Sequence, residues 1–142
     1  MPDKHNITLA LFYCRNVPES GEKDRLELEE KYGRVIRLFP IPCSGRLEPI
    51  HLLRALEAFA DAVYVITCPE GMCRYFEGNQ RAKKRVDRTQ EIIAGIGLEK
   101  KRVGIIIGSK EDPKSLAKLV EEIFESIFKM EPSPVLKQTN RT

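Results

Sequence analysis

Four short apolar runs alternate with four segments of helical pattern, and this alternation constrains the fold more than any other feature of the sequence. The runs are rich in β-branched and aromatic residues, which is typical of strands buried on both faces. They occupy residues 7–13, 35–41, 63–67 and 103–107. The segments that follow them predict helices at residues 22–31, 47–60 and 75–96, and from 112–113 onward.

Such an alternation predicts an α/β fold, because parallel strands need a crossover connection that a helix usually supplies. We expect an open, mostly parallel four-stranded sheet in the order 2-1-3-4, covered by helices in a Rossmann- or flavodoxin-like arrangement. The length of 142 residues fits one domain. We place this single α/β domain at residues 7–130, after a polar arm at 1–6 and before a tail at 131–142 that is either disordered or a docking peptide.

The composition excludes several classes of protein. A formal net charge of +3 does not require nucleic acid or a membrane as partner, and no apolar run approaches the roughly 20 residues that span a bilayer. The polar residues 1–6 lack the apolar segment of a signal peptide, so we expect a cytoplasmic protein with reduced thiols. In that compartment four cysteines indicate a metal site or redox chemistry rather than two disulfides. No phosphate-binding motif and no nucleophile–base–acid set supports nucleotide binding or hydrolysis.

The four cysteines occupy related places in this pattern. Cys14 and Cys68 directly follow predicted strands, Cys43 comes two residues after one, and Cys73 shares a turn with Cys68. Because the carboxyl ends of parallel strands meet at one edge of the sheet, four thiolates can converge there. Four-cysteine sites hold zinc or an iron–sulfur cluster. Two alternatives stay open: a thiol–disulfide redox protein that uses Cys68 and Cys73, and ordinary buried cysteines without a ligand.

Two arginines accompany these cysteines. Arg46 lies three residues after Cys43, and Arg74 directly follows Cys73. A cluster bound by four thiolates is an anion, and nearby charge and hydrogen bonds tune its reduction potential. Arg46 and Arg74 are therefore candidates for contacts around a cluster, the alternative being solvated surface side chains.

Other polar residues are weaker candidates for a functional role. His51 follows Ile50 on a predicted helix, where a lone histidine is more often structural than a ligand. The predicted helix at residues 75–96 carries a set of basic side chains, namely Arg81, Lys83, Lys84, Arg85 and Arg88. They form either a solvated face or a docking surface for an acidic redox partner. Nucleic acid is disfavoured, because no aromatic stacking platform accompanies them.

Two motifs resemble those of a known family. They are C-S-G-R at residues 43–46 and C-P-E-G-M-C-R-Y-F-E-G-N at 68–79, followed by Arg81, Ala82, Arg85 and Val86. Over residues 7–130 the sequence resembles the delta subunit of methyl-viologen-reducing hydrogenase, the iron–sulfur protein that associates with heterodisulfide reductase. The resemblance implies a non-catalytic electron-transfer subunit with one [2Fe–2S] cluster, whose ligands are Cys14, Cys43, Cys68 and Cys73. Zinc in a structural interaction module is the alternative cofactor.

The resemblance also implies partners. They are a hydrogenase or formate dehydrogenase module and the flavin subunit of heterodisulfide reductase, with no nucleic acid or membrane, and a homo-oligomer within the complex is compatible with this role. The sequence departs from the family pattern in two places. The C-x-x-C after the first strand is reduced to Cys14, so an all-cysteine cluster must use all four cysteines. Pro69 and Arg74 stand where the family carries histidines, which implies an altered cluster potential or partner.

Overall fold

A computed structural model describes residues 7–14, 17–41, 47–67, 78–108, 113–127 and 129–134. In this part of the chain four strands and four helices alternate. The strands are β1 (Leu9–Cys14), β2 (Ile36–Ile41), β3 (Ala62–Thr67) and β4 (Val103–Ile107). The helices are α1 (Glu22–Tyr32), α2 (Pro49–Ala58), α3 (Gly78–Gly95) and α4 (Leu116–Ile127), and two 3-10 turns, η2 (Gly33–Val35) and η4 (Lys100–Arg102), precede β2 and β4.

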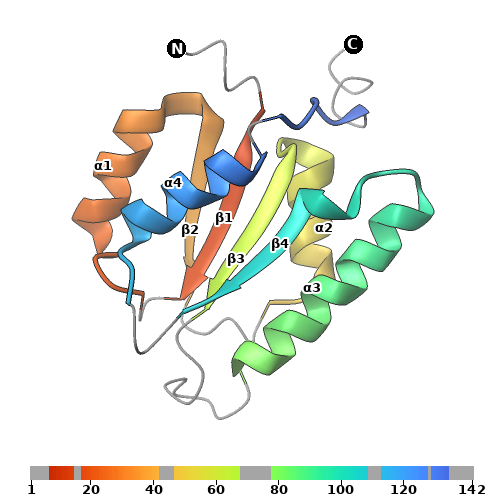
Figure 1. The fold of residues 1–142 in the computed structure, drawn as a ribbon, viewed down its shortest axis with the longest axis horizontal. Coiled ribbons are helices and arrows are strands. Elements are labelled where there is room, and N and C mark those ends of the chain that lie inside the picture. Colours follow the sequence, from red (N-terminus) through yellow and green to blue (C-terminus); the bar gives the residue numbers. More distant parts are fainter. Residues whose placement is uncertain are drawn as a thin grey trace.

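The strands form one open, parallel sheet in the order β2-β1-β3-β4, which confirms the predicted topology (Figure 1). In β1, which lies between β2 and β3, only Phe12 is partly exposed, and β3 is buried to a similar extent. The edge strands β2 and β4 are exposed at several positions. The most continuous apolar runs therefore belong to the inner strands, where both faces are covered.

Helices cover both faces of the sheet. Alternate residues of β1 divide between two cores, because successive side chains of a strand point to opposite faces. Leu9 and Leu11 pack with α1 and α4 on one face, whereas Ala10 packs with α2 and α3 on the other. α4 contributes its apolar side through Leu116, Leu119, Val120, Ile123, Phe124 and Ile127. None of the helices in the described ranges combines the length and the apolar composition that a bilayer crossing requires.

The helix ends follow local signals, with one correction. Gly33 ends α1 with a φ of 65°, a conformation that glycine adopts without strain, and Pro49 occupies the first turn of α2. The predicted start of the last helix at 112–113 is wrong, because residues 113–115 are not helical and α4 begins at Leu116. The Ser115 hydroxyl accepts a hydrogen bond from the Lys118 N–H at 3.2 Å. Serine is a favoured residue at the position before a helix, and it sets the boundary here.

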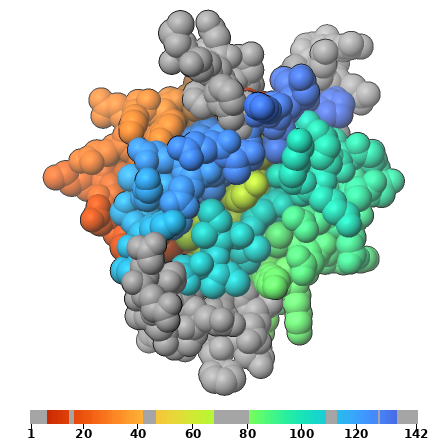
Figure 2. Space-filling model, in the orientation of Figure 1, coloured from red at the N-terminus to blue at the C-terminus, as the bar shows by residue number. Residues whose placement is uncertain are grey.

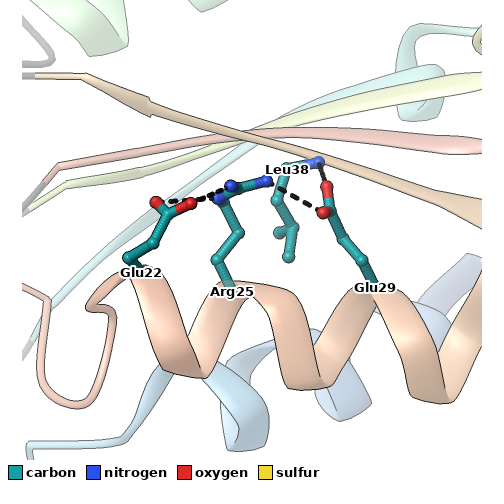
Figure 3. A network of polar contacts seen from close by, with 4 residues as sticks. All are labelled: Glu22, Arg25, Glu29 and Leu38. Carbon is teal, nitrogen blue, oxygen red and sulfur yellow. Dashed lines mark hydrogen bonds and ion pairs between the residues drawn. The ribbon is translucent and has the colours of Figure 1, made fainter.

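The outer edge of β2 has few unpaired backbone N–H groups that could bind another strand. Glu29 of α1 accepts a hydrogen bond from the Leu38 N–H at 3.4 Å, and the same carboxylate pairs with Arg25, which also contacts Glu22 (Figure 3). Two residues further along β2, Pro40 has no N–H. Both features disfavour the addition of another strand at this edge.

The opposite edge strand, β4, lies at the surface. Figure 2 shows its atoms exposed beside α4, and Ile107 is 38% exposed. Gly104 is the register partner of Tyr64 on β3. A Cβ atom at position 104 would lie 2.5 Å from Cε2 of Tyr64, so the Tyr64 ring packs directly on the backbone of β4. Only glycine permits this approach.

A buried polar network lies at the amino edge of the sheet, where Thr8, Asp61 and Arg102 directly precede β1, β3 and β4. The Asp61 carboxylate accepts hydrogen bonds from the N–H groups of Thr8 and Ser133, each at 2.7 Å. Arg102, which is 1% exposed, donates to the Asp61 carbonyl at 3.0 Å and to the Glu131 carbonyl at 2.8 Å. This network holds residues 131–134, the first four of the predicted tail, on the domain.

Candidate functional site

The carboxyl edge of the sheet brings together the ends of the strands that the cysteines follow. Cys14, the last residue of β1, is the register partner of Ile41, the last residue of β2. On the other side of β1, Tyr13 pairs with Ile66, one residue before the end of β3. Neighbouring strands lie about 4.8 Å apart. The three strand ends therefore meet within the reach of side chains and short connections.

Cys14 is the predicted site residue that the structure describes. It is 1% exposed, carries a free thiol and packs in the core beneath α1 and α4. Its carbonyl accepts a hydrogen bond from the Val17 N–H at 3.0 Å, which links the end of the strand to the turn at residues 17–19. The Ser20 hydroxyl donates to the Val17 carbonyl at 2.6 Å and stabilises this turn. The thiol is thereby held at the carboxyl edge, away from bulk water.

The other predicted site residues lie outside the described residues. They are Cys43, Arg46, Cys68, Cys73 and Arg74. The described chain does fix where their segments begin and end. Residues 42–46 connect Ile41 with Leu47, and residues 68–77 connect Thr67 with Gly78. Both segments leave the sheet at the edge that Cys14 occupies, because β2 and β3 run parallel to β1.

An arginine joins the chain segments that follow these two connections. Arg85 of α3 donates a hydrogen bond to the Leu47 carbonyl at 2.8 Å and pairs with the Glu48 carboxylate at 3.4 Å. The sequence indicates only that Arg85 belongs to a basic set, and no local spacing could reveal a partner 38 residues away. His51 has the structural role expected of it, since its Nδ1 accepts a hydrogen bond from the Glu48 N–H at 2.9 Å.

The helices place partial positive charge around the same edge. Each of the four helices follows a parallel strand, so their amino ends lie on the side of the sheet where the strands end. The start of α4 is joined to the turn after β1 by the Leu116 N–H, which donates to the Pro18 carbonyl at 3.0 Å. Amino ends of helices carry partial positive charge and favour anions. The edge is therefore electrostatically suited to thiolates or another anionic group.

Among the described residues, the carboxylates with a shifted pKa lie in two other places. At the start of α1, the hydrogen bond from Arg25 lowers the pKa of Glu22. On the far side of the sheet, the hydrogen bond from Arg102 lowers the pKa of Glu99. Both shifts arise from salt bridges between side chains of the same local segment. They stabilise carboxylates and do not mark an acid or base for catalysis.

The described residues do not themselves form a metal centre. No group of three or more histidine, cysteine, aspartate or glutamate side chains gathers within the described ranges. Of the four cysteines, only Cys14 falls in these ranges, so the result concerns carboxylates and histidines elsewhere in the fold.

A comparison with protein families shows how this chain is related to known proteins. Residues 9–131 match the family described as methyl-viologen-reducing hydrogenase, delta subunit. The chain belongs to this family. The matched range contains all four cysteines, and the resemblance that the motifs indicate is confirmed.

Relatives of two kinds share this similarity. An iron-sulfur subunit of the F420-non-reducing hydrogenase of Archaeoglobus profundus is 32% identical over 105 residues, which cover 74% of this chain and 77% of the relative. The vhu iron-sulfur subunit of the F420-non-reducing hydrogenase of Methanocaldococcus jannaschii is 28% identical over 76% of this chain and 81% of its own length. A subunit of the ferredoxin:CoB-CoM heterodisulfide reductase of Methanosarcina mazei is 35% identical over 71% of this chain, but only 13% of that larger protein is covered.

Proposed function

We propose that this chain is an electron-transfer subunit of a complex that contains hydrogenase and heterodisulfide reductase modules, and that it holds one [2Fe–2S] cluster. The proposed ligands are Cys14, Cys43, Cys68 and Cys73. The position of Cys14 carries the proposal: it is a buried thiol at the end of the central strand, at the edge where the segments with the other cysteines begin. Family membership, and relatives named iron-sulfur subunits, support this class of cofactor.

The residues at the carboxyl edge fit such a cofactor. Cysteine thiolates are the usual ligands of iron–sulfur clusters, and a bound cluster would supply a one-electron carrier. The apolar surroundings of Cys14 would restrict access of water, while the amino ends of the helices favour the negative charge of the thiolates. Arg46 and Arg74 are proposed to add positive charge beside the ligands. The [2Fe–2S] type rests on the family resemblance, and an iron count separates it from a [4Fe–4S] cluster, which also takes four cysteines.

The two kinds of relatives support hydrogenase and heterodisulfide reductase modules as partners, whereas the formate dehydrogenase alternative and the flavin-containing subunit rest on the family resemblance. Some are subunits of a hydrogenase, and others belong to a heterodisulfide reductase. In the Methanosarcina mazei protein the similar region is part of a much longer chain. A covalent connection of that kind keeps two modules at high effective concentration, so it supports direct contact where the modules are separate. We propose a hydrogenase or formate dehydrogenase module as donor, and the flavin-containing subunit of a heterodisulfide reductase as acceptor.

Electron transfer can be tested by mixing experiments without oxygen. The chain, reduced with dithionite and freed of excess reductant, is mixed with a shortened form of the Methanosarcina mazei heterodisulfide reductase protein that lacks the region similar to this chain, and visible absorption is followed by stopped flow. We expect the chain to become oxidised while the flavin of its partner becomes reduced. A Cys73→Ala variant should transfer no electrons, whereas the exposed control variant Lys100→Ala should behave as the wild type. A reduced, cluster-containing chain that stays reduced in the presence of this protein would contradict the proposed acceptor.

A further inference from the structure

Positive charge is concentrated on one short part of the surface. Residues 81–88, in the first half of α3, contain five basic side chains and one acidic side chain, a formal charge of +4, although the whole chain carries only +3. The buried side of α3 consists of Ala82, Val86, Thr89 and Ile93. Arg81, Lys83, Lys84 and Arg88 lie on its exposed side. We call these four residues together the α3 basic patch.

Helix α1, on the opposite face of the sheet, contains a basic side chain whose charge is offset by ion pairs within the helix. It contains five acidic and three basic residues, and Arg25 is bound by both Glu22 and Glu29 (Figure 3). In α3, by contrast, Arg81, Lys83 and Lys84 make no ion pair within the described part of the chain, and Arg88 pairs only with the exposed Glu91 at 3.4 Å. The positive charge of the α3 basic patch is therefore available to a partner.

The α3 basic patch lies beside the candidate redox site. α3 begins at Gly78, directly after the segment that contains Cys68 and Cys73, and Figure 1 shows its start next to the carboxyl edge of the sheet. Arg85 holds this part of α3 against the start of α2 through Leu47 and Glu48. Ile50, two residues further along α2, is 50% exposed. Protein interfaces usually combine exposed apolar side chains with a polar rim.

We propose that the α3 basic patch, together with Ile50, is the docking surface for an acidic face of the protein that exchanges electrons with this chain. Opposite charges speed association and orient the two surfaces. α1 and α4, on the other face of the sheet, each contain two more acidic than basic residues, so an acidic partner is repelled from that face. Nucleic acid is the less favoured occupant, because α3 contains no aromatic residue on which bases could stack. The electron exchange rests on the proposed function, whereas the docking surface rests on the distribution of charge.

Lysine acetylation in the intact complex provides the test. The complex is purified at low salt through an affinity tag on this chain, and acetylation rates of its lysines are compared with those of the free chain by mass spectrometry. We expect Lys83 and Lys84 to react about fivefold or more slowly in the complex, because a docked interface excludes water and reagent. Lys23, Lys100 and Lys101 are also exposed but lie outside α3, and their rates should not change. Equal rates at all five positions, or recovery of the tagged chain alone, would overturn the proposal.

Charge reversal separates docking from cofactor binding. A variant with Arg81→Glu, Lys84→Glu and Arg88→Glu should bind its partner about tenfold or more weakly, and the wild-type affinity should fall steeply with salt. The control variant with Lys23→Glu, Lys100→Glu and Lys101→Glu changes the net charge equally and should bind as the wild type. Both variants should keep the iron and sulfide content of the wild type, so a failure of docking is distinct from a failure of the cluster proposal. Unchanged affinity of the first variant, or tight binding of the wild type to a 20-base-pair DNA duplex in place of the protein, would refute the assignment.

Discussion

The two edges of the sheet carry polar residues at corresponding positions in the sequence, with opposite consequences. At the amino edge, Asp61 and Arg102 directly precede strands, and their hydrogen bonds are made within the chain. At the carboxyl edge, Cys14 ends β1 as a buried free thiol, and Cys68 is the residue after β3. This difference indicates that a buried polar group whose hydrogen bonds are made within the chain stabilises the fold. A buried thiol that can still coordinate a metal is available to a cofactor. Variants at the amino edge should therefore affect stability, and variants at the carboxyl edge should affect the cofactor.

The largest effect on stability is expected at Arg102. Arg102→Met retains much of the buried volume but leaves the carbonyls of Asp61 and Glu131 without this donor. We expect the free energy of unfolding to fall by about 2–4 kcal/mol, since buried acceptors lose their hydrogen bonds. Urea denaturation followed by circular dichroism measures it. The exposed neighbour supplies the control, because Lys101→Met should change stability by less than about 0.5 kcal/mol. If the free energy of unfolding of the Arg102 variant falls by less than about 1 kcal/mol, the amino edge does not have the stabilising role that distinguishes it from the carboxyl edge.

A smaller loss is expected two residues into β4. In Gly104→Ala the new methyl group would meet the Tyr64 ring at 2.5 Å, so the ring must move, at a cost of about 1–3 kcal/mol. Gly95→Ala is the matched control, because no atom lies within 4 Å of its new methyl group. At the end of α3 this change should be neutral or stabilise by up to about 1 kcal/mol. In a Tyr64→Leu background the methyl group no longer meets the ring, so Gly104→Ala should lower the free energy of unfolding by less than it does in the wild type. An equal loss in both backgrounds would show that the clash with Tyr64 is not the cause.

At the carboxyl edge, a substitution should change the cofactor content more than the stability. Cys14→Ala removes one proposed ligand, and we expect the iron and sulfide content to fall to near zero, while the free energy of unfolding of the cluster-free variant falls by only about 1 kcal/mol relative to the cluster-free wild type. Val17→Ala is the control: Val17 is 5% exposed and packs in the same core, so this variant should lose stability yet keep its cluster. A Cys14→Ala protein with the full iron content would remove Cys14 from the ligand set.

The smallest effect concerns pH at the amino edge. The hydrogen bond from Arg102 lowers the pKa of Glu99 below its ordinary value of 4.5. The folded protein then binds this proton less readily than the unfolded chain, so the stabilisation is present above about pH 4.5 and is lost as the pH falls through the lower, folded pKa. Because Glu99 is 44% exposed, the contribution should stay below about 1 kcal/mol. Comparing the pH dependence of unfolding in wild type and Glu99→Gln measures it, and identical slopes below pH 4.5 would contradict this coupling.

The sequence predicts the sheet because its signals are local. Each strand is an apolar run, each intervening helix has its own periodicity, and alternation makes the strands parallel. The start of α4 shows the limit, since the signal at 112–113 predicts the helix too early and the hydrogen bond from the Lys118 N–H to Ser115 marks the observed boundary. Cys14 could be placed for the same reason as the sheet: it directly follows a recognisable strand.

The amino-edge network could not be predicted, because its partners are far apart in sequence. Arg102 ends the run of residues 100–102, in which Lys100 and Lys101 are exposed and only Arg102 is buried. Nothing in three adjacent basic residues distinguishes the buried one. Asp61 and Ser133 are separated by 72 positions, so their contact arises only from the folded sheet. The same holds for Arg85, whose bond to Leu47 turns one member of a basic set into a link between two helices.

The central claim is that the carboxyl edge binds one [2Fe–2S] cluster through four cysteines. The most direct measurement is iron, acid-labile sulfide and zinc per chain, with a visible absorption spectrum, on protein purified without oxygen. We predict a coloured protein with about two iron and two sulfide per chain, and loss of both in each single cysteine-to-alanine variant. A colourless protein with about one zinc per chain would contradict the claim.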